Sequence, residues 1–117
     1  MQATVSQKNF KKALGLAEKV VSKNTALPIL NNILLRTENG RLKISATNLA
    51  VGINATIGAK VDEIGEITIP ARIITDFVNH LSDETVLLTA KNNILIINSD
   101  NYKTQILGLS AKDYPII

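Results

Sequence analysis

Apolar residues between positions 7 and 23 recur at the spacing of an amphipathic helix. At about 100° per residue they share one face of that helix, which is formed by Phe10, Ala13, Leu14, Ala17, Val20 and Val21. Ser6 is a suitable N-cap, and Lys23 suits the negative end of the helix dipole. We therefore expect a helix over residues 7–23, preceded by a short strand at residues 1–5.

The pattern then changes to the period of strands. Pro28 favours an extended entry into residues 30–37, and Asn39-Gly40 between apolar runs favours a tight hairpin turn. Alternation follows, with Leu42, Ile44 and Ala46 on one face and Lys43, Ser45 and Thr47 on the other. A second alternating strand is expected at residues 51–59. We expect residues 60–65 to be a polar link.

The same order of elements begins again after this link. Residues 66–69 are strand-like, and Pro70 opens a helix whose apolar face is Ile73, Ile74, Phe77, Val78 and Leu81. Strands are then expected at residues 86–90, 94–98 and 102–109. The chain thus predicts the order β-α-β-β-β twice, at about residues 1–60 and 66–109. This is an α+β fold, with two helices packed against antiparallel sheets in a single domain over residues 1–117.

Composition narrows the class of protein. An apolar content of 45% in 117 residues supports one packed core. The absence of cysteine excludes disulfides and thiolate metal sites. Neither a signal peptide nor a membrane-spanning run is visible. We expect a soluble, cytoplasmic protein.

Charge is concentrated on the first helix. Lys8, Lys12, Lys19 and Lys23 fall within about 60° of each other on the face opposite the apolar one, and Glu18 is the only acid in this stretch. A one-sided positive face suits a polyanion. A solubilising helix face is the alternative interpretation.

Candidate catalytic chemistry is sparse. His80 is the only histidine, and neither a phosphate-binding glycine loop nor a nucleophile–base pair is evident. With aromatic residues at 3%, single-strand binding by base stacking is disfavoured. We expect no enzyme, no metal and no cofactor. A small protein-interaction module, which would use the C-terminal edge strand, is the alternative from a different class, and an enzyme is a weaker one.

Four segments resemble one family in order and spacing. Leu27-Pro28-Ile29-Leu30 resembles the "TLPILxNxLL" segment of the bacterial DNA sliding clamp, the beta subunit of DNA polymerase III. Residues 40–49 resemble its "G-x-L-x-L-x-x-T-D-L" hairpin, and residues 69–72 resemble its "V-P-A-R/K" helix start. Residues 109–115 resemble its "L-P-A-x-D-F-P" segment. Asn48 stands where clamps usually carry Asp.

The resemblance implies a fold and a function. It implies the DNA-clamp fold, here as the first of three domains, so the chain is expected to be a fragment. Two subunits would close head to tail into a ring around duplex DNA. This non-catalytic processivity factor of DNA replication would tether the polymerase. Implied partners are double-stranded DNA, a second clamp subunit, the replicative DNA polymerase and the clamp loader. The last two would bind through domains absent here.

The resemblance also implies site residues. Those facing DNA, without sequence preference, would be Lys8, Lys12, Lys19, Lys23, Asn24 and Arg72. Those at the subunit interface would lie on the last strand and the second helix, namely Lys103, Thr104, Ile106, Leu107 and Phe77. For Phe77, as for Ile73, burial in the domain core is the alternative.

Overall fold

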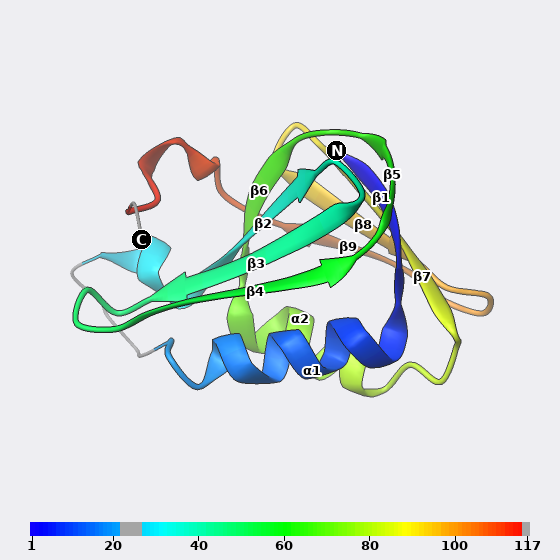
Figure 1. Cartoon of the computed structure of the whole chain (residues 1–117), viewed down its shortest axis with the longest axis horizontal. Coiled ribbons are helices and arrows are strands. Elements are labelled where there is room, and N and C mark those ends of the chain that lie inside the picture. Colours follow the sequence, from blue (N-terminus) through cyan, green and yellow to red (C-terminus); the bar gives the residue numbers. More distant parts are fainter. Residues whose placement is uncertain (22–26, 116–117) are drawn as a thin grey trace.

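Two antiparallel sheets lie over a layer of two helices in the computed structural model (Figure 1), which describes residues 1–21 and 27–115. The first half of the chain contains β1 (Gln2–Ser6), α1 (Gln7–Glu18), the 3₁₀ helix η1 (Pro28–Asn31), β2 (Asn32–Glu38), β3 (Arg41–Thr47) and β4 (Gly52–Gly58). The second half contains β5 (Lys60–Glu63), β6 (Glu66–Pro70), α2 (Ala71–Asn79), β7 (Thr85–Lys91), β8 (Ile94–Asn98), β9 (Lys103–Leu107) and the 3₁₀ helix η2 (Ala111–Asp113).

The sheet order confirms the duplicated topology. One sheet has the order β4-β3-β2-β6, and the other has the order β5-β1-β7-β8-β9. The meander β2-β3-β4 of the first repeat is extended by β6 of the second, which pairs with β2. The meander β7-β8-β9 of the second repeat is extended by β1 of the first, which pairs with β7. This exchange interlocks the two halves around one core.

The first helix is shorter than the sequence pattern predicts. Ser6 caps it as expected, since its Oγ accepts a hydrogen bond from the Asn9 backbone N–H at 3.2 Å. Helix α1 ends at Glu18, whereas the prediction extended it to Lys23. Val20 and Val21 instead form tighter turns, with their N–H groups on the carbonyls three residues earlier. Both are β-branched and weak helix formers, and both pack against the core from partly buried positions.

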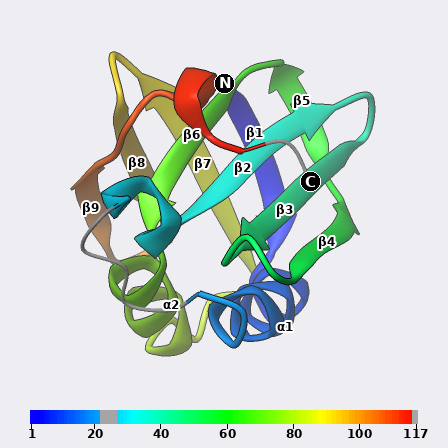
Figure 2. The ribbon, with the colours of Figure 1, turned by 90° about the vertical axis from the view of Figure 1, so that its left-hand side faces the viewer.

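The two helices lie side by side (Figure 2) and run antiparallel (Figure 1). The Gln7 side chain at the start of α1 donates to the backbone carbonyl of Val78, near the end of α2, at 2.9 Å. Pro70 immediately precedes α2, as the sequence indicates. The pair forms one continuous helical layer below both sheets.

Two further expectations about chain path were wrong. Pro28 begins a 3₁₀ turn, in which the Leu30 N–H reaches the Leu27 carbonyl at 3.0 Å, so the strand starts only at Asn32. The expected polar link contains strand β5, which pairs antiparallel with β1 at the edge of the five-stranded sheet. An edge strand can be polar because much of its surface faces water, and this weakens its signal in the sequence.

The core fills the space between the sheets and the helices. Both repeats contribute fully buried side chains to it, including Phe10, Leu14, Leu35, Ile44, Ile67, Ile74 and Leu88. The predicted alternation in β3 is confirmed, because Leu42, Ile44 and Ala46 are buried in this core. Ser45 and Thr47, on the opposite face of β3, are buried as well. The C-terminal segment lies over that face, and its Tyr114 hydroxyl donates to the Asn32 carbonyl at 3.1 Å.

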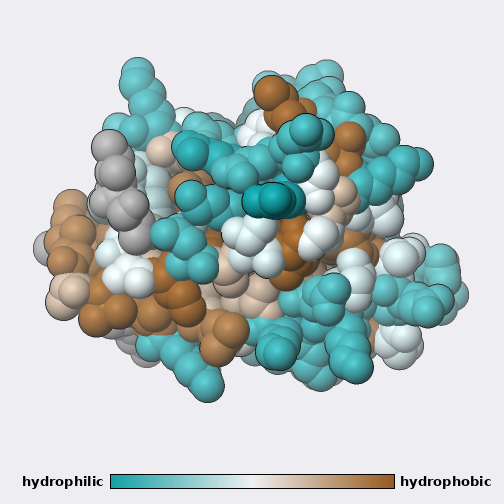
Figure 3. All heavy atoms as spheres, in the orientation of Figure 1, coloured by the Kyte–Doolittle hydropathy of each residue, from teal (hydrophilic) through white to brown (hydrophobic). Residues whose placement is uncertain are grey.

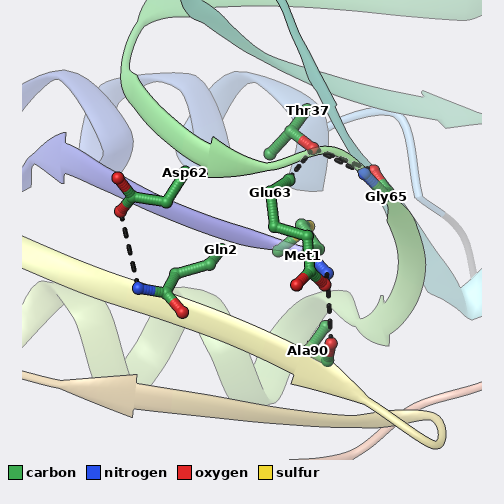
Figure 4. A network of polar contacts seen from close by, with 7 residues as sticks. All are labelled: Met1, Gln2, Thr37, Asp62, Glu63, Gly65 and Ala90. Carbon is green, nitrogen blue, oxygen red and sulfur yellow. Dashed lines mark hydrogen bonds and ion pairs between the residues drawn. The ribbon is translucent and has the colours of Figure 1, made fainter.

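A polar network joins β5 to the strands beside it (Figure 4). The Met1 ammonium lies 2.8 Å from Glu63 Oε1 and 3.3 Å from the Ala90 carbonyl. The hydrogen bond and the charge of this ammonium lower the pKa of the Glu63 carboxyl. The Thr37 hydroxyl accepts a hydrogen bond from the Gly65 N–H at 2.8 Å, which fixes the turn after β5.

Candidate nucleic-acid interface

A basic surface covers the outer side of α1. Lys8, Lys12 and Lys19 are exposed, as is Lys11 beside them, while Phe10 and its neighbours on the other face are buried. The structure therefore brings together three of the four lysines that the sequence places in one stripe. Lys23 and Asn24 lie outside the described residues, so their positions stay predictions.

The charge of this surface is not compensated within the described part of the chain. The ion pairs found there are Met1–Glu63 and Arg36–Glu66, and neither includes a residue of α1. Glu18, the only acid of α1, is half-buried, and its Oε2 atom is shielded from solvent without a hydrogen-bond partner. The exposed lysines of this surface thus have no ion-pair partner among the described residues.

Helix α2 continues the surface with a weaker charge. Arg72, Asn79 and His80 are exposed, and so is Asp76. The side chain of Asn79 joins residues of α1 around a shallow hollow of about 630 Å³, whose other lining residues are Lys8, Asn9, Lys11, Lys12, Gly15, Leu16 and Lys19. Arg72 lies at the other end of α2, consistent with the antiparallel arrangement of the helices.

This arrangement is suited to sequence-independent contact with phosphates. Lysine is a compact charge on a flexible stem that can follow a phosphate without demanding one geometry. Phosphate contacts carry no direct sequence information. In the described ranges, no group of three or more histidine, cysteine, aspartate or glutamate side chains could hold a metal ion.

Figure 3 shows hydrophobic residues gathered at the end of the molecule where the turn between β3 and β4 lies. Leu49 and Val51 of this turn are exposed, and Leu49 has a positive φ of 76°. The Asn48 side chain holds the turn by accepting hydrogen bonds from the N–H groups of Ala50 and Val51, at 2.9 and 2.8 Å. An aspartate at this position would accept the same bonds, so the departure from the family pattern leaves the turn intact.

Strand β9 forms an edge of the five-stranded sheet, as the sequence predicts. The backbone hydrogen bonds just before and just after β9 show which of its backbone groups do not pair with β8. The Ser99 N–H bonds to the Tyr102 carbonyl and the Gly108 N–H bonds to the Asn93 carbonyl, each at 2.8 Å. Because antiparallel pairing alternates, the even-numbered residues of β9 bond to β8. The N–H and C=O groups of Lys103, Gln105 and Leu107 therefore point to the open edge.

The side chains expected at a subunit interface divide between two faces of β9. Lys103 and Leu107 are exposed, Thr104 is half-buried and Ile106 is 6% exposed within the domain core. The Ile106 side chain therefore packs into the core of this domain, and its place at a subunit interface stays a prediction. Successive side chains of a strand point to opposite faces, so residues 104 and 106 share the core-facing side. Gln105 is the exposed residue that the sequence reasoning missed, although the same alternation could have identified it.

For Phe77 and Ile73 on α2, the sequence allows either burial in the domain core or a place at the subunit interface. Phe77 is half-buried and packs against the core, whereas Ile73 is 55% exposed. At about 100° per residue, both lie on the flank of α2 opposite Asn79, which is the flank away from α1. Ile73 thus adds an exposed apolar group on this side of the helical layer.

Comparison with known proteins gives these surfaces a context. The family model described as DNA polymerase III beta subunit, N-terminal domain, matches residues 1–117. The chain belongs to this family. The beta sliding clamps of Synechocystis sp. and Caulobacter vibrioides are 29% and 32% identical to it, each over 100% of the chain and 32% of the relative. The chain spans about a third of the length of these curated relatives.

Solved structures of the family agree with the observed fold. The beta sliding clamp of Caulobacter crescentus superimposes with a TM-score of 0.94 at 35% identity, over 100% of this chain and 32% of that one. Membership in the clamp family disfavours the alternative of an independent interaction module. Among the described residues, no helix is long and apolar enough to cross a membrane.

Proposed function

We propose that this chain acts as the first domain of a sliding-clamp subunit in bacterial DNA replication. Three such domains would form a subunit, and two subunits would close head to tail around duplex DNA. The role is mechanical and not catalytic. The ring keeps the replicative polymerase on its template and thereby raises processivity. Its site of action is the cytoplasm.

The single observation that carries this proposal is the unpaired basic surface of α1 on a fold shared with the clamp family. Lys8, Lys12 and Lys19 supply weak phosphate contacts, and Lys23, Asn24 and Arg72 complete the set. A ring that must slide needs attraction without base readout. Topological closure supplies the retention that such contacts lack.

Strand β9 is the proposed contact with the second subunit. Its open edge offers the backbone groups of Lys103, Gln105 and Leu107 to a strand of the partner, a common mode of recognition. Leu107 is 74% exposed and is the apolar side chain on that edge, while Thr104 is half-buried on the opposite face of the strand. Phe77 and Ile73 extend the contact to the flank of α2. The polymerase and the clamp loader bind through parts of the subunit beyond this domain.

Charge reversal tests the proposed DNA contact. In a clamp subunit that contains this domain, the combined change Lys8→Glu, Lys12→Glu and Lys19→Glu is expected to abolish processive synthesis on a primed circular template. The three substitutions lower the net charge of the domain by about six units, which converts attraction of phosphates into repulsion. The measurement is product length in a reaction with polymerase and clamp loader.

A matched variant separates this effect from net charge. Arg41, Lys60 and Lys112 are also exposed, but they belong to β3, β5 and η2 and not to the helical layer. Their combined change to glutamate is expected to leave product length close to that of the unmodified clamp. Equal product lengths for the two triple variants would contradict the assignment of α1 as the DNA-facing surface.

A further inference from the structure

The two helices of the layer differ sharply in charge. Helix α1 exposes three lysines, its C-cap Lys19 is a fourth, and its one acid, Glu18, is half-buried. Helix α2 exposes one base, Arg72, and one acid, Asp76, so their charges cancel. If the whole layer served only to attract phosphates, an exposed acid on α2 would oppose that role.

Asp76 lies on the side of α2 that belongs to the basic surface. Asn79 shares the hollow with the lysines of α1, and at about 100° per residue Arg72, Asp76 and Asn79 follow one side of α2. The hydrogen bond from Gln7 to Val78 sets the start of α1 beside the end of α2. Asp76, just before that end, is therefore next to the N-terminal half of α1.

Within residues 1–21 and 27–115, the carboxylate of Asp76 takes part in no ion pair. The acids in ion pairs among the described residues are Glu63 and Glu66. The hydrogen bond at Asp76 uses its backbone carbonyl, which lies 2.6 Å from His80 Nδ1. Asp76 is exposed, so its carboxylate can act on a ligand of this surface. The Asp76 carboxylate would repel the phosphates of a nucleic acid.

We propose that Asp76 limits the affinity of the helical layer for duplex DNA. It offsets the charge of Arg72 on α2, so that α1 carries most of the contact and the contact stays weak enough for sliding. This inference rests on the proposed function. Repulsion of this kind acts over about 10 Å at 0.1 M salt and weakens as salt increases.

The test is a titration of the 117-residue chain with a short DNA duplex at low salt, followed by backbone amide chemical shifts. Asp76→Asn is expected to tighten binding several-fold, with the gain shrinking as salt is added. Asp76→Lys adds a phosphate contact, so the slope of log K against log salt is expected to steepen by about 0.9. Asp113→Asn makes the same charge change on η2, which lies far from the helices (Figure 1), and is expected to leave affinity unchanged.

Two outcomes would overturn the inference and differ from each other. Shifts on α1 with equal affinities for Asp76→Asn and Asp113→Asn would remove the role of Asp76 and leave the proposed function standing. A duplex that shifts neither helix in any variant would remove the basic surface as a DNA contact, and the role of Asp76 with it.

Discussion

At the scale of single residues, Tyr114 is a titratable side chain that also packs the C-terminal segment against the domain. Its ring is 7% exposed, and its hydroxyl donates to the carbonyl of Asn32. Burial raises the pKa of Tyr114 above its usual 10, partly opposed by a hydrogen bond with the Thr47 backbone. The neutral phenol is therefore the form that the fold favours.

Stability should consequently fall at alkaline pH. The pKa in the folded state lies above that in the unfolded state, so the contribution is complete below about pH 10 and is lost as pH rises toward the folded value. Urea unfolding of the wild type and of Tyr114→Phe between pH 8 and 11 measures this. Tyr114→Phe is expected to lose about 1 kcal/mol at pH 8, the value of one hydrogen bond, and to show a flatter decline. A parallel decline in the two proteins would contradict the assignment.

At the scale of elements, the end of β9 is held against β6 by a very close approach of two backbones. The N–H and C=O groups of Thr68 and Leu109 form two hydrogen bonds, at 2.9 and 3.0 Å. A Cβ atom on Gly108 would lie 2.3 Å from the Thr68 carbonyl oxygen and 2.8 Å from Ile69 Cδ1. Only glycine leaves room for this junction between the two sheets.

Gly108→Ala is therefore expected to destabilise the domain. The clash falls on backbone that cannot move without breaking the junction, so a loss of about 2 kcal/mol or more is expected, at the upper part of the range for overpacking. Urea unfolding measures it. Gly58→Ala is the control, because a Cβ there meets nothing within 4 Å. Backbone entropy by itself favours alanine over glycine, so similar losses for both variants would contradict the clash as the specific cause of the loss at position 108.

Elements with strong periodicity could be predicted from the sequence, and their ends and edges could not. The alternation of Leu42, Ile44 and Ala46 and the stripe of lysines on α1 each reflect a local period that sequence carries directly. The end of α1 and the existence of β5 depend on tertiary partners, since Val20 turns to reach the core and β5 pairs with β1. The exposure of Gln105 and the burial of Ile106 follow from which side of β9 the core occupies. That side is fixed by the whole sheet and by no short stretch of it.

At the scale of the whole molecule, the two repeats place their two helices on one side and leave β9 at a lateral edge (Figure 2). In the proposed ring, the two helices would line the hole and β9 would join one subunit to the next. The side chains of β9 contribute little apolar area to closure, because Ile106 faces the core and Leu107 alone is both apolar and exposed. Backbone pairing along the edge is then the main source of specificity in the proposed subunit contact.

Gln105→Pro tests this directly. Proline lacks the N–H that position 105 presents to the open edge, and proline is tolerated where a strand edge faces solvent. In a subunit that contains this domain, the variant is expected to shift the equilibrium from dimer to monomer in light scattering, while far-UV circular dichroism stays unchanged. Gln105→Ala keeps the N–H and is expected to stay dimeric. If both variants dimerise as the wild type does, the subunits are not joined through the backbone of β9.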